Sequence, residues 1–450
     1  MTKIIDNSFF LISLGCAKNL VDSRGMSHLL HQNDLFEVHE PSHARFLIVN
    51  TCGFIESARQ ESLDVLRKMA RNKKKDQILI AAGCMTQRYQ SALLKQVHGI
   101  DAMLGTRRWM DIHQVLENLI QGDTSTKPYL HFPPALSMGI DLKGSPALAI
   151  QGRSSYLKIA DGCRRPCAYC AIPLIKGSLV SRPAEDIVSD MLILQDQGIQ
   201  EVNVIAQDVT DYGHDLGIKD GLLRLLDSMV KAAPNIPWIR LLYTYPGFNV
   251  DGLIGVMRSH PQILPYIDIP LQHAEPKVLR AMQRPMNVEL VKSALFKLRE
   301  QFEFMTLRTT FIVGFPNETD SAFETLINFV NELRFDHLGA FTYSLELGTP
   351  AEPLGDPIPQ VIKEERLSIL MKTQTQIASQ INRTLVGTEM DVLIEGVDIK
   401  QHVLVGRSKR DAPEVDGLVI VQGIGNVGDI VKVKIQGALE HDLIGSIVGH

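Results

Sequence analysis

The sequence lacks any run of 18 consecutive apolar residues, so we expect no transmembrane helix. It also lacks an excess of basic residues. The net charge of −5 argues against a strongly basic nucleic-acid-binding protein, although it leaves room for a local basic patch. The apolar run at residues 9–14 is too short for an export signal. We therefore expect a cytoplasmic protein whose cysteines are reduced thiols.

Cysteine is scarce, with six in 450 residues, and half of the six lie in one short stretch. Cys163, Cys167 and Cys170 follow a C-x3-C-x2-C spacing, and three thiols cannot all pair as disulfides. A structural zinc site needs a fourth ligand, and the nearest histidines in sequence are His131 and His214. An iron–sulfur cluster with one open iron fits three thiolates better. The alternative is a group of ordinary buried cysteines.

Each of the other three cysteines follows a short apolar run, which predicts a β-strand. The runs are residues 9–14, 45–50 and 77–82, and the cysteines are Cys16, Cys52 and Cys84. A helical pattern follows each run, which predicts a parallel α/β domain. Parallel strands end at one edge of a sheet, so we expect the three cysteines to converge and hold a second cluster. The alternative is three unrelated cysteines at strand ends.

A second alternation of strands and helices covers residues 150–345. The predicted strands are residues 156–160, 201–206, 238–244, 265–269, 307–313 and 337–343. Six such units predict a partial (βα)6 barrel of the TIM type, with its active site at the C-terminal ends of the strands. The Cys163 loop follows the first of these strands and therefore belongs to that mouth.

The chain divides into an N-terminal domain at 1–122, a linker at 123–149, the barrel at 150–380 and a small β domain at 381–450. The linker is rich in Gly, Pro, Ser and Thr, and we expect it to let the first domain sit against the barrel without sharing its core. Residues 363–382 show the pattern of an amphipathic helix. Alternating apolar and polar residues at 431–436 predict a half-buried strand in a small antiparallel domain. The fold class is α/β.

The loop at Cys163 resembles the cluster loop of the radical S-adenosylmethionine (SAM) enzymes, C-x3-C-x-aromatic-C, with Tyr169 as the aromatic residue. The resemblance implies that a 4Fe-4S cluster binds SAM and splits it to a deoxyadenosyl radical. We expect Tyr169, Gln207 and Gly314 to contact SAM, because all three lie at the mouth. Asp208 and the turn at 314–316 also follow strands there. His273 has either a functional role or only local hydrogen bonds.

Two three-cysteine sets and a β tail resemble the methylthiotransferase branch of the radical SAM enzymes, with a TRAM domain at the C-terminus. Residues 14–23 and 406–417 resemble the RimO subgroup. Ala17 and Arg24 depart from the usual Pro and Glu of that subgroup, and neither is a cluster ligand.

The resemblance implies an enzyme that adds a methylthio group to the β-carbon of an aspartate in ribosomal protein S-twelve. It implies two 4Fe-4S clusters, two SAM molecules and an electron donor such as flavodoxin or ferredoxin. Residues 381–450 carry seven Lys and Arg against ten Asp and Glu, so we expect no transfer-RNA partner. We expect Asp411, Glu414 and Asp416 to face a basic protein.

Two alternatives are open. The first is the same chemistry on an adenosine of transfer RNA, as in the MiaB subgroup, which tends to carry Gln-Met-Asn after its first cysteine. The second is an RNA-binding module that a metal stabilises and that catalyses nothing.

Overall fold

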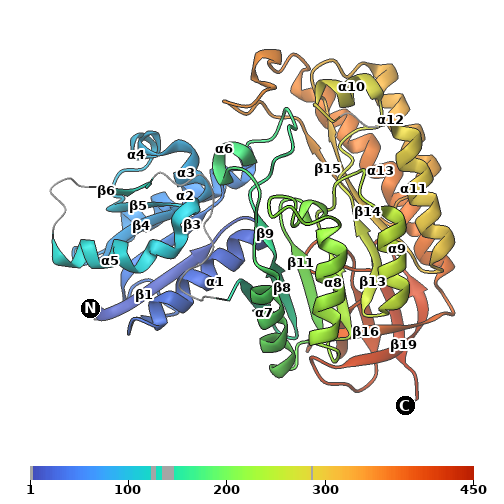
Figure 1. Ribbon diagram of the computed structural model, residues 1–450, viewed down its shortest axis with the longest axis horizontal. Helices are drawn as coiled ribbons and strands as arrows, with labels where there is room; N and C mark the ends of the chain where they lie inside the picture. Colours follow the sequence, from blue (N-terminus) through green and yellow to red (C-terminus); the bar gives the residue numbers. More distant parts are fainter. Residues whose placement is uncertain (1–3, 123–127, 134–145, 285–286, 450) are drawn as a thin grey trace.

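The computed structural model describes residues 4–122, 128–133, 146–284 and 287–449 (Figure 1). An N-terminal lobe lies beside a larger barrel, and a small β domain lies beneath the barrel in this view. The predicted α/β class is confirmed. Within the described ranges, no helix is both long and apolar enough to span a membrane.

The N-terminal lobe contains a six-stranded parallel sheet. Its order is β2 (Phe36–Glu37), β1 (Ile5–Ser13), β3 (Ala44–Thr51), β4 (Ile78–Gly83), β5 (Ala102–Gly105) and β6 (Tyr129–His131). Helices α1 (Ala17–His31) and α5 (Ile112–Gln121), with the 3-10 helix η1 (Thr106–Asp111) between β5 and α5, cover one face. Helices α2 (Glu56–Asn72), α3 (Cys84–Tyr89) and α4 (Ser91–Gln96) cover the other. The three predicted strands are confirmed, and β2, β5 and β6 were too short to be predicted. The strands β1, β3 and β4 are neighbours, so their C-terminal ends lie together.

The barrel is an open curved sheet of six parallel strands with one antiparallel edge strand. Its order is β7 (Leu148–Gln151), β8 (Ser154–Lys158), β11 (Glu201–Ile205), β12 (Trp238–Leu241), β13 (Ile263–Asp268), β14 (Thr306–Val313) and β15 (His337–Thr342). Its helices are α7 (Ala184–Asp196), α8 (Gly221–Ala232), α9 (Val250–Ser259), α10 (Pro276–Ala281), α11 (Val288–Gln301), α12 (Asp320–Leu333) and α13 (Gln360–Thr384). All six predicted parallel strands and the predicted helix at 363–382 are confirmed.

The segment predicted as a linker contributes β6 to the first sheet and β7 to the second. Its residues 123–127 and 134–145 lie outside the described residues. The expectation that the two domains share no core is wrong. Helix α1 lies against β7 and β8, and its Val21 packs in one apolar cluster with Tyr156 and Ile205 of the barrel. The amphipathic pattern does not reveal this, because α1 is buried both on its own sheet and on the barrel.

The C-terminal domain is a closed five-stranded barrel. Its order is β16 (Glu389–Asp398), β17 (Val403–Ser408), β18 (Val419–Gln422), β20 (Leu443–Ile447) and β19 (Ile430–Ala438). The pairing is antiparallel, as predicted, except for the parallel pair β18–β20.

Residues 407–416 of this domain close the end of the large barrel at which the strands begin. Arg407 pairs with Glu201, the first residue of β11, at 2.5 Å, and Asp416 accepts a hydrogen bond from Tyr266 of β13 at 2.6 Å. The expectation of an acidic docking surface is therefore wrong for Asp411 and Asp416, whereas Glu414 is exposed. The Asp411 and Asp416 side chains are buried instead of facing solvent. Asp416 pairs with Arg308 of the barrel, and Asp411 accepts a hydrogen bond from Ser408 and lies 3.6 Å from His337 of the barrel.

Candidate active site

The N-terminal cysteines lie where three neighbouring strands end. Cys16 immediately precedes α1, Cys52 follows β3 and Cys84 opens α3. Gly15 has a φ of +91°, and a β-carbon added to it would lie 2.6 Å from that of Cys52, so only glycine lets these turns meet. The Cys84 thiol is close enough to feel the charges of both Cys16 and Cys52. The predicted convergence is therefore present.

Polar side chains hold this group of turns. The amide nitrogen of Asn19 donates to the carbonyls of Leu14 and Thr51 at 2.9 and 3.0 Å, and its oxygen accepts from the Cys84 thiol at 3.3 Å. Ser62 accepts from the Cys52 backbone N–H at 3.0 Å. Sequence reasoning missed both residues. Asn19 was within reach, since it lies three residues after Cys16 and capping amides are common at such turns.

The barrel cysteines lie on the loop between β9 (Ala160–Asp161), which follows β8, and α6 (Ile172–Lys176). Cys163 donates its N–H to the Gly177 carbonyl at 3.1 Å, and Cys170 donates to the Cys167 carbonyl at 3.1 Å. These bonds fold the loop so that all three thiols line one cavity of about 490 Å³. The loop closes against its return segment at Gly162, where φ is +74° and a β-carbon would overlap the Ser178 carbonyl.

The donor sets fit iron–sulfur clusters. All six cysteines are free, and burial raises the pKa of Cys163 to about 11 and that of Cys170 to about 12. Without a metal these thiols hold their protons at neutral pH. No three His, Cys, Asp or Glu side chains within the described ranges are gathered tightly enough for a single metal ion. A four-iron cube binds each thiolate through a different iron, so it accepts thiols that are near each other yet spread out.

Arg284 is a buried cation beside the barrel cysteines. Its Nη1 donates to the Cys167 sulfur at 3.5 Å and to the Tyr169 hydroxyl at 3.4 Å, and its Nη2 donates to the Pro270 carbonyl at 2.7 Å. Its guanidinium also lies 4.4 Å from the centre of the Tyr245 ring. Sequence reasoning missed Arg284, because nothing near it in the sequence indicates a loop 117 residues away.

The other predicted mouth residues differ in their surroundings. Gln207 donates to Asp161 at 3.0 Å, and its oxygen is buried with no partner within the described structure. The Cα of Gly314 faces the Lys363 side chain, and its N–H donates to Glu318 at 2.7 Å. His273 is fully buried, accepts the Glu275 N–H at 3.0 Å and lies 3.5 Å from Glu318. Its Nδ1 is therefore satisfied locally, whereas its buried Nε2 has no hydrogen-bond partner within the described residues.

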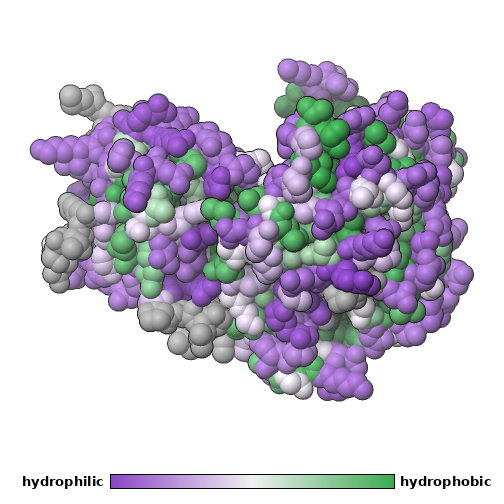
Figure 2. Space-filling view, turned by 90° about the horizontal axis from the view of Figure 1, so that it is seen from above, coloured by the Kyte–Doolittle hydropathy of each residue, from purple (hydrophilic) through white to green (hydrophobic). Residues whose placement is uncertain are grey.

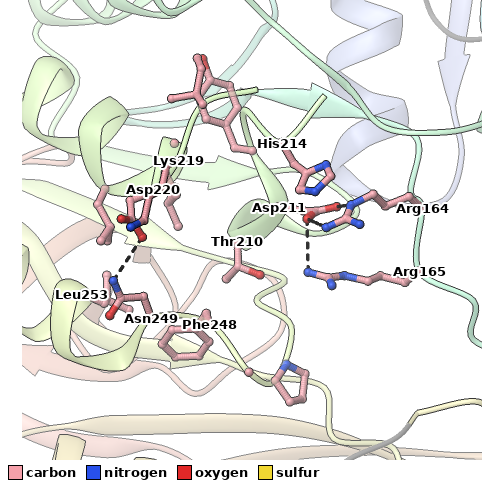
Figure 3. A pocket seen from close by; sticks show the side chains of 17 residues that line it. Arg164, Arg165, Thr210, Asp211, His214, Lys219, Asp220, Phe248, Asn249 and Leu253 are labelled. Atoms are coloured by element: carbon pink, nitrogen blue, oxygen red, sulfur yellow. Dashed lines mark hydrogen bonds and ion pairs between the residues drawn. The ribbon is translucent and has the colours of Figure 1, made fainter. Parts of the chain in front are cut away.

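A second cavity, of about 420 Å³, shares Arg164 and Arg165 of the cluster loop with the first (Figure 3). Arg164 and Arg165 point into it from the loop and pair with Asp211 at 2.6 and 3.4 Å. Arg165 also binds Asp208 at 2.8 Å, and burial raises the pKa of Asp208. These pairs tie the cysteine loop to the strand end after β11. Seen from above, the surface is hollowed between the N-terminal lobe and the barrel, and apolar side chains gather on the barrel side (Figure 2).

Comparisons with known proteins cover all three domains. Residues 157–330 match the radical SAM superfamily, residues 386–448 match the TRAM domain, and residues 8–105 match a family described as "Uncharacterized protein family UPF0004". A Roseiflexus protein named "Ribosomal protein uS12 methylthiotransferase RimO" is 42% identical, over 98% of this chain and 97% of its own. A protein of the same name from Desulforamulus reducens is 41% identical, over 98% and 99%.

The chain belongs to the RimO family of methylthiotransferases. Members are radical SAM enzymes, and radical SAM chemistry depends on a 4Fe-4S cluster and SAM. Among solved structures, the radical SAM methyltransferase TsrM from Kitasatospora setae has a TM-score of 0.57 at 13% identity, over 85% of this chain and 79% of that one. At that identity the likeness shows the fold alone.

Proposed function

We propose that this RimO-family enzyme adds a methylthio group to the β-carbon of an aspartate in ribosomal protein S-twelve. The relatives' name supplies the substrate. The observation that carries the proposal is the contact between the N-terminal cysteine set and the segment that follows the barrel cysteines. Cys84 packs in one cluster with Ala171, the residue after Cys170. Sulfur delivery and radical formation therefore have sites on the same side of the molecule.

Each cysteine set has a separate role in this proposal. Cys163, Cys167 and Cys170 would hold the cluster that binds SAM, with Tyr169, Gln207 and Gly314 as candidate contacts. Cys16, Cys52 and Cys84 would hold a second 4Fe-4S cluster. When bound, the groups supply an electron to split SAM, a radical to take hydrogen from the target carbon, and sulfur. The protein's own contribution is to position these groups and to exclude water, and the buried, unpartnered Gln207 oxygen is a candidate acceptor.

The proposal also covers the partners and the domains. An electron donor such as flavodoxin or ferredoxin would reduce the clusters, and a second SAM would supply the methyl group. The division at residues 122, 150 and 381 is part of the proposal. We infer that docking does not use Asp411 or Asp416, because both side chains are buried, with Asp416 paired with Arg308 of the barrel.

Mass spectrometry tests the substrate. Ribosomal proteins and transfer RNA are compared from cells with the gene, without it, and with a variant in which Cys16, Cys52 and Cys84 are Ala. We expect the methylthio mass on one aspartate of ribosomal protein S-twelve only with the intact gene. A gene-dependent methylthio group on transfer RNA, with the ribosomal protein unchanged, would contradict the proposal and show that transfer RNA is the substrate.

A further inference from the structure

Four buried charged side chains connect the N-terminal lobe to the barrel between the two cysteine sets. Asp22 comes from α1, whereas Lys158, Asp161 and Lys176 come from β8, β9 and α6. None of the four side chains is more than 6% exposed. Because an unpaired buried charge is costly, the pairing of these groups restricts how the lobe and the barrel meet.

Both lysines bridge the same two carboxylates, one from each lobe. Lys158 pairs with Asp22 and lies 2.6 Å from Asp161. The Nζ of Lys176 lies 2.8 Å from Oδ2 of Asp22 and 3.4 Å from Oδ1 of Asp161. A shift of α1 along the barrel would therefore separate Asp22 from both lysines at once.

The helix that carries Lys176 also touches both cysteine sets. Helix α6 begins two residues after Cys170 in the chain. Cys84 of the N-terminal set packs against Ala171 and Ile175 at the start and on the inner side of this helix. The position of Lys176 is thus tied to the barrel loop by the chain and to the other set by contact.

The charges of this network reach the Cys84 thiol with opposite signs. Burial raises the pKa of Cys84, the ammonium of Lys176 acts to lower it, and the carboxylate of Asp22 acts to raise it. On Lys176 itself, burial works against the charge, but Asp161, Asp22 and Cys84 outweigh burial and raise its pKa. Lys176 directly follows Ile175, the residue that packs against this cysteine, and it pairs there with Asp22 and Asp161.

We propose that Lys176 and Asp22 are a positioning pair that locks α6 to α1 and sets the charge around a cluster on Cys16, Cys52 and Cys84. The inference rests on the second cluster of the proposed function. In the low-dielectric interior, the nearby cation stabilises an added electron on the cluster and the nearby carboxylate opposes it. The reduction potential of the N-terminal cluster therefore depends on both residues.

An EPR-monitored redox titration of the reconstituted full-length protein tests the pair. The variant with Cys163, Cys167 and Cys170 changed to Ala identifies which midpoint potential belongs to the N-terminal cluster. We expect Lys176→Met to shift that potential to a more negative value and Asp22→Asn to shift it to a less negative one. The double variant restores the charge balance and should return close to the parent.

Arg107→Met is the matched control. Arg107 of η1 also holds α6 to the N-terminal lobe, but it donates to the backbone carbonyls of Ile175 and Leu174 at 2.8 and 2.9 Å. Loss of the Arg107 side chain should loosen the contact between α6 and the N-terminal lobe, but it should leave the reduction potential of the N-terminal cluster unchanged. An equal shift in Arg107→Met, shifts of the same sign in Lys176→Met and Asp22→Asn, or no shift in either would overturn the inference.

A variant that does not fold and a parent with fewer irons than expected are also informative outcomes. If Lys176→Met fails to fold, the nearly isosteric Asp22→Asn settles the question by the sign of its shift. Iron analysis of the parent distinguishes failure of the proposed second cluster from failure of the role of Lys176 and Asp22. A parent with only one cluster removes the proposed second site and this inference together, whereas two clusters with an unmoved potential remove only the role of the pair.

Discussion

The guanidinium Nη1 of Arg284 lies 3.5 Å from the sulfur of Cys167, with the Arg284 side chain almost wholly buried. A buried cation beside a thiolate contributes a charge-assisted hydrogen bond of about 1.5–3 kcal/mol. We expect Arg284→Met to slow reductive SAM cleavage about tenfold or more, measured as deoxyadenosine released. Arg284→Lys, which keeps the charge, should lose less. A parent-like rate in Arg284→Met would contradict this role.

The two cysteine sets predict a simple iron count. Reconstituted protein should hold about eight irons, and changing Cys163, Cys167 and Cys170 to Ala should leave about four. Changing Cys16, Cys52 and Cys84 instead should also leave about four, with SAM cleavage intact and no methylthio product. Chemical iron analysis and SAM cleavage assays measure both. About four irons in the parent would argue against a second cluster.

Gly15→Ala should damage one cluster site only. The new β-carbon would lie 2.6 Å from that of Cys52, so the turns at Cys16 and Cys52 must separate. We expect about half of the iron to be lost, with SAM cleavage retained. Gly122→Ala is the control, because Gly122 also has a positive φ, of +74°, but a β-carbon there meets none of the described residues within 4 Å. Both changes carry a backbone cost of about 1–2 kcal/mol. Equal iron contents in the two variants would refute the steric argument.

The junction between barrel and tail should weaken in acid. Burial acts to raise the pKa of Glu201, but Arg240 and Arg407 outweigh it and lower that pKa from 4.5 to about 2. A lowered pKa means stability that is present above pH 4.5 and lost as the pH falls towards 2, in total about 3 kcal/mol.

Urea unfolding of the parent and of Glu201→Gln at several pH values measures the contribution of Glu201 to the free energy of unfolding. The variant should be less stable at pH 7 and should lose less stability than the parent between pH 4.5 and 2. Parallel pH profiles for the two proteins would show that Glu201 does not carry the effect.

Local signals made the strands and the cysteine sets predictable. An apolar run followed by a cysteine at a strand end marks both the strand and its position at the sheet edge, and the C-x3-C-x2-C loop lies within eight residues. Short strands such as β5 and β6 carry too few residues for such a signal.

Contacts between distant residues were not predictable. Asp22 and Lys176 are 154 residues apart, and no pattern near either one indicates the other. The prediction that Asp411 and Asp416 belong to a docking surface was wrong for a related reason. Net charge counts Asp411 and Asp416 as surface groups, although both side chains are buried and Asp416 forms an ion pair with Arg308 of the barrel. A charge count describes a surface only when the charges are exposed.

The contact between residues 407–416 and the large barrel also affects when the barrel can fold during translation. Glu201 and Arg240 leave the ribosome long before Arg407, which stands near the end of a 450-residue chain. Until then Glu201 has one of its two cationic partners, and the lower end of the barrel is open to water. The barrel can therefore complete this contact only after Arg407 has been synthesised, and chains truncated before Arg407 should be recognised by chaperones or proteases instead of accumulating as folded barrels.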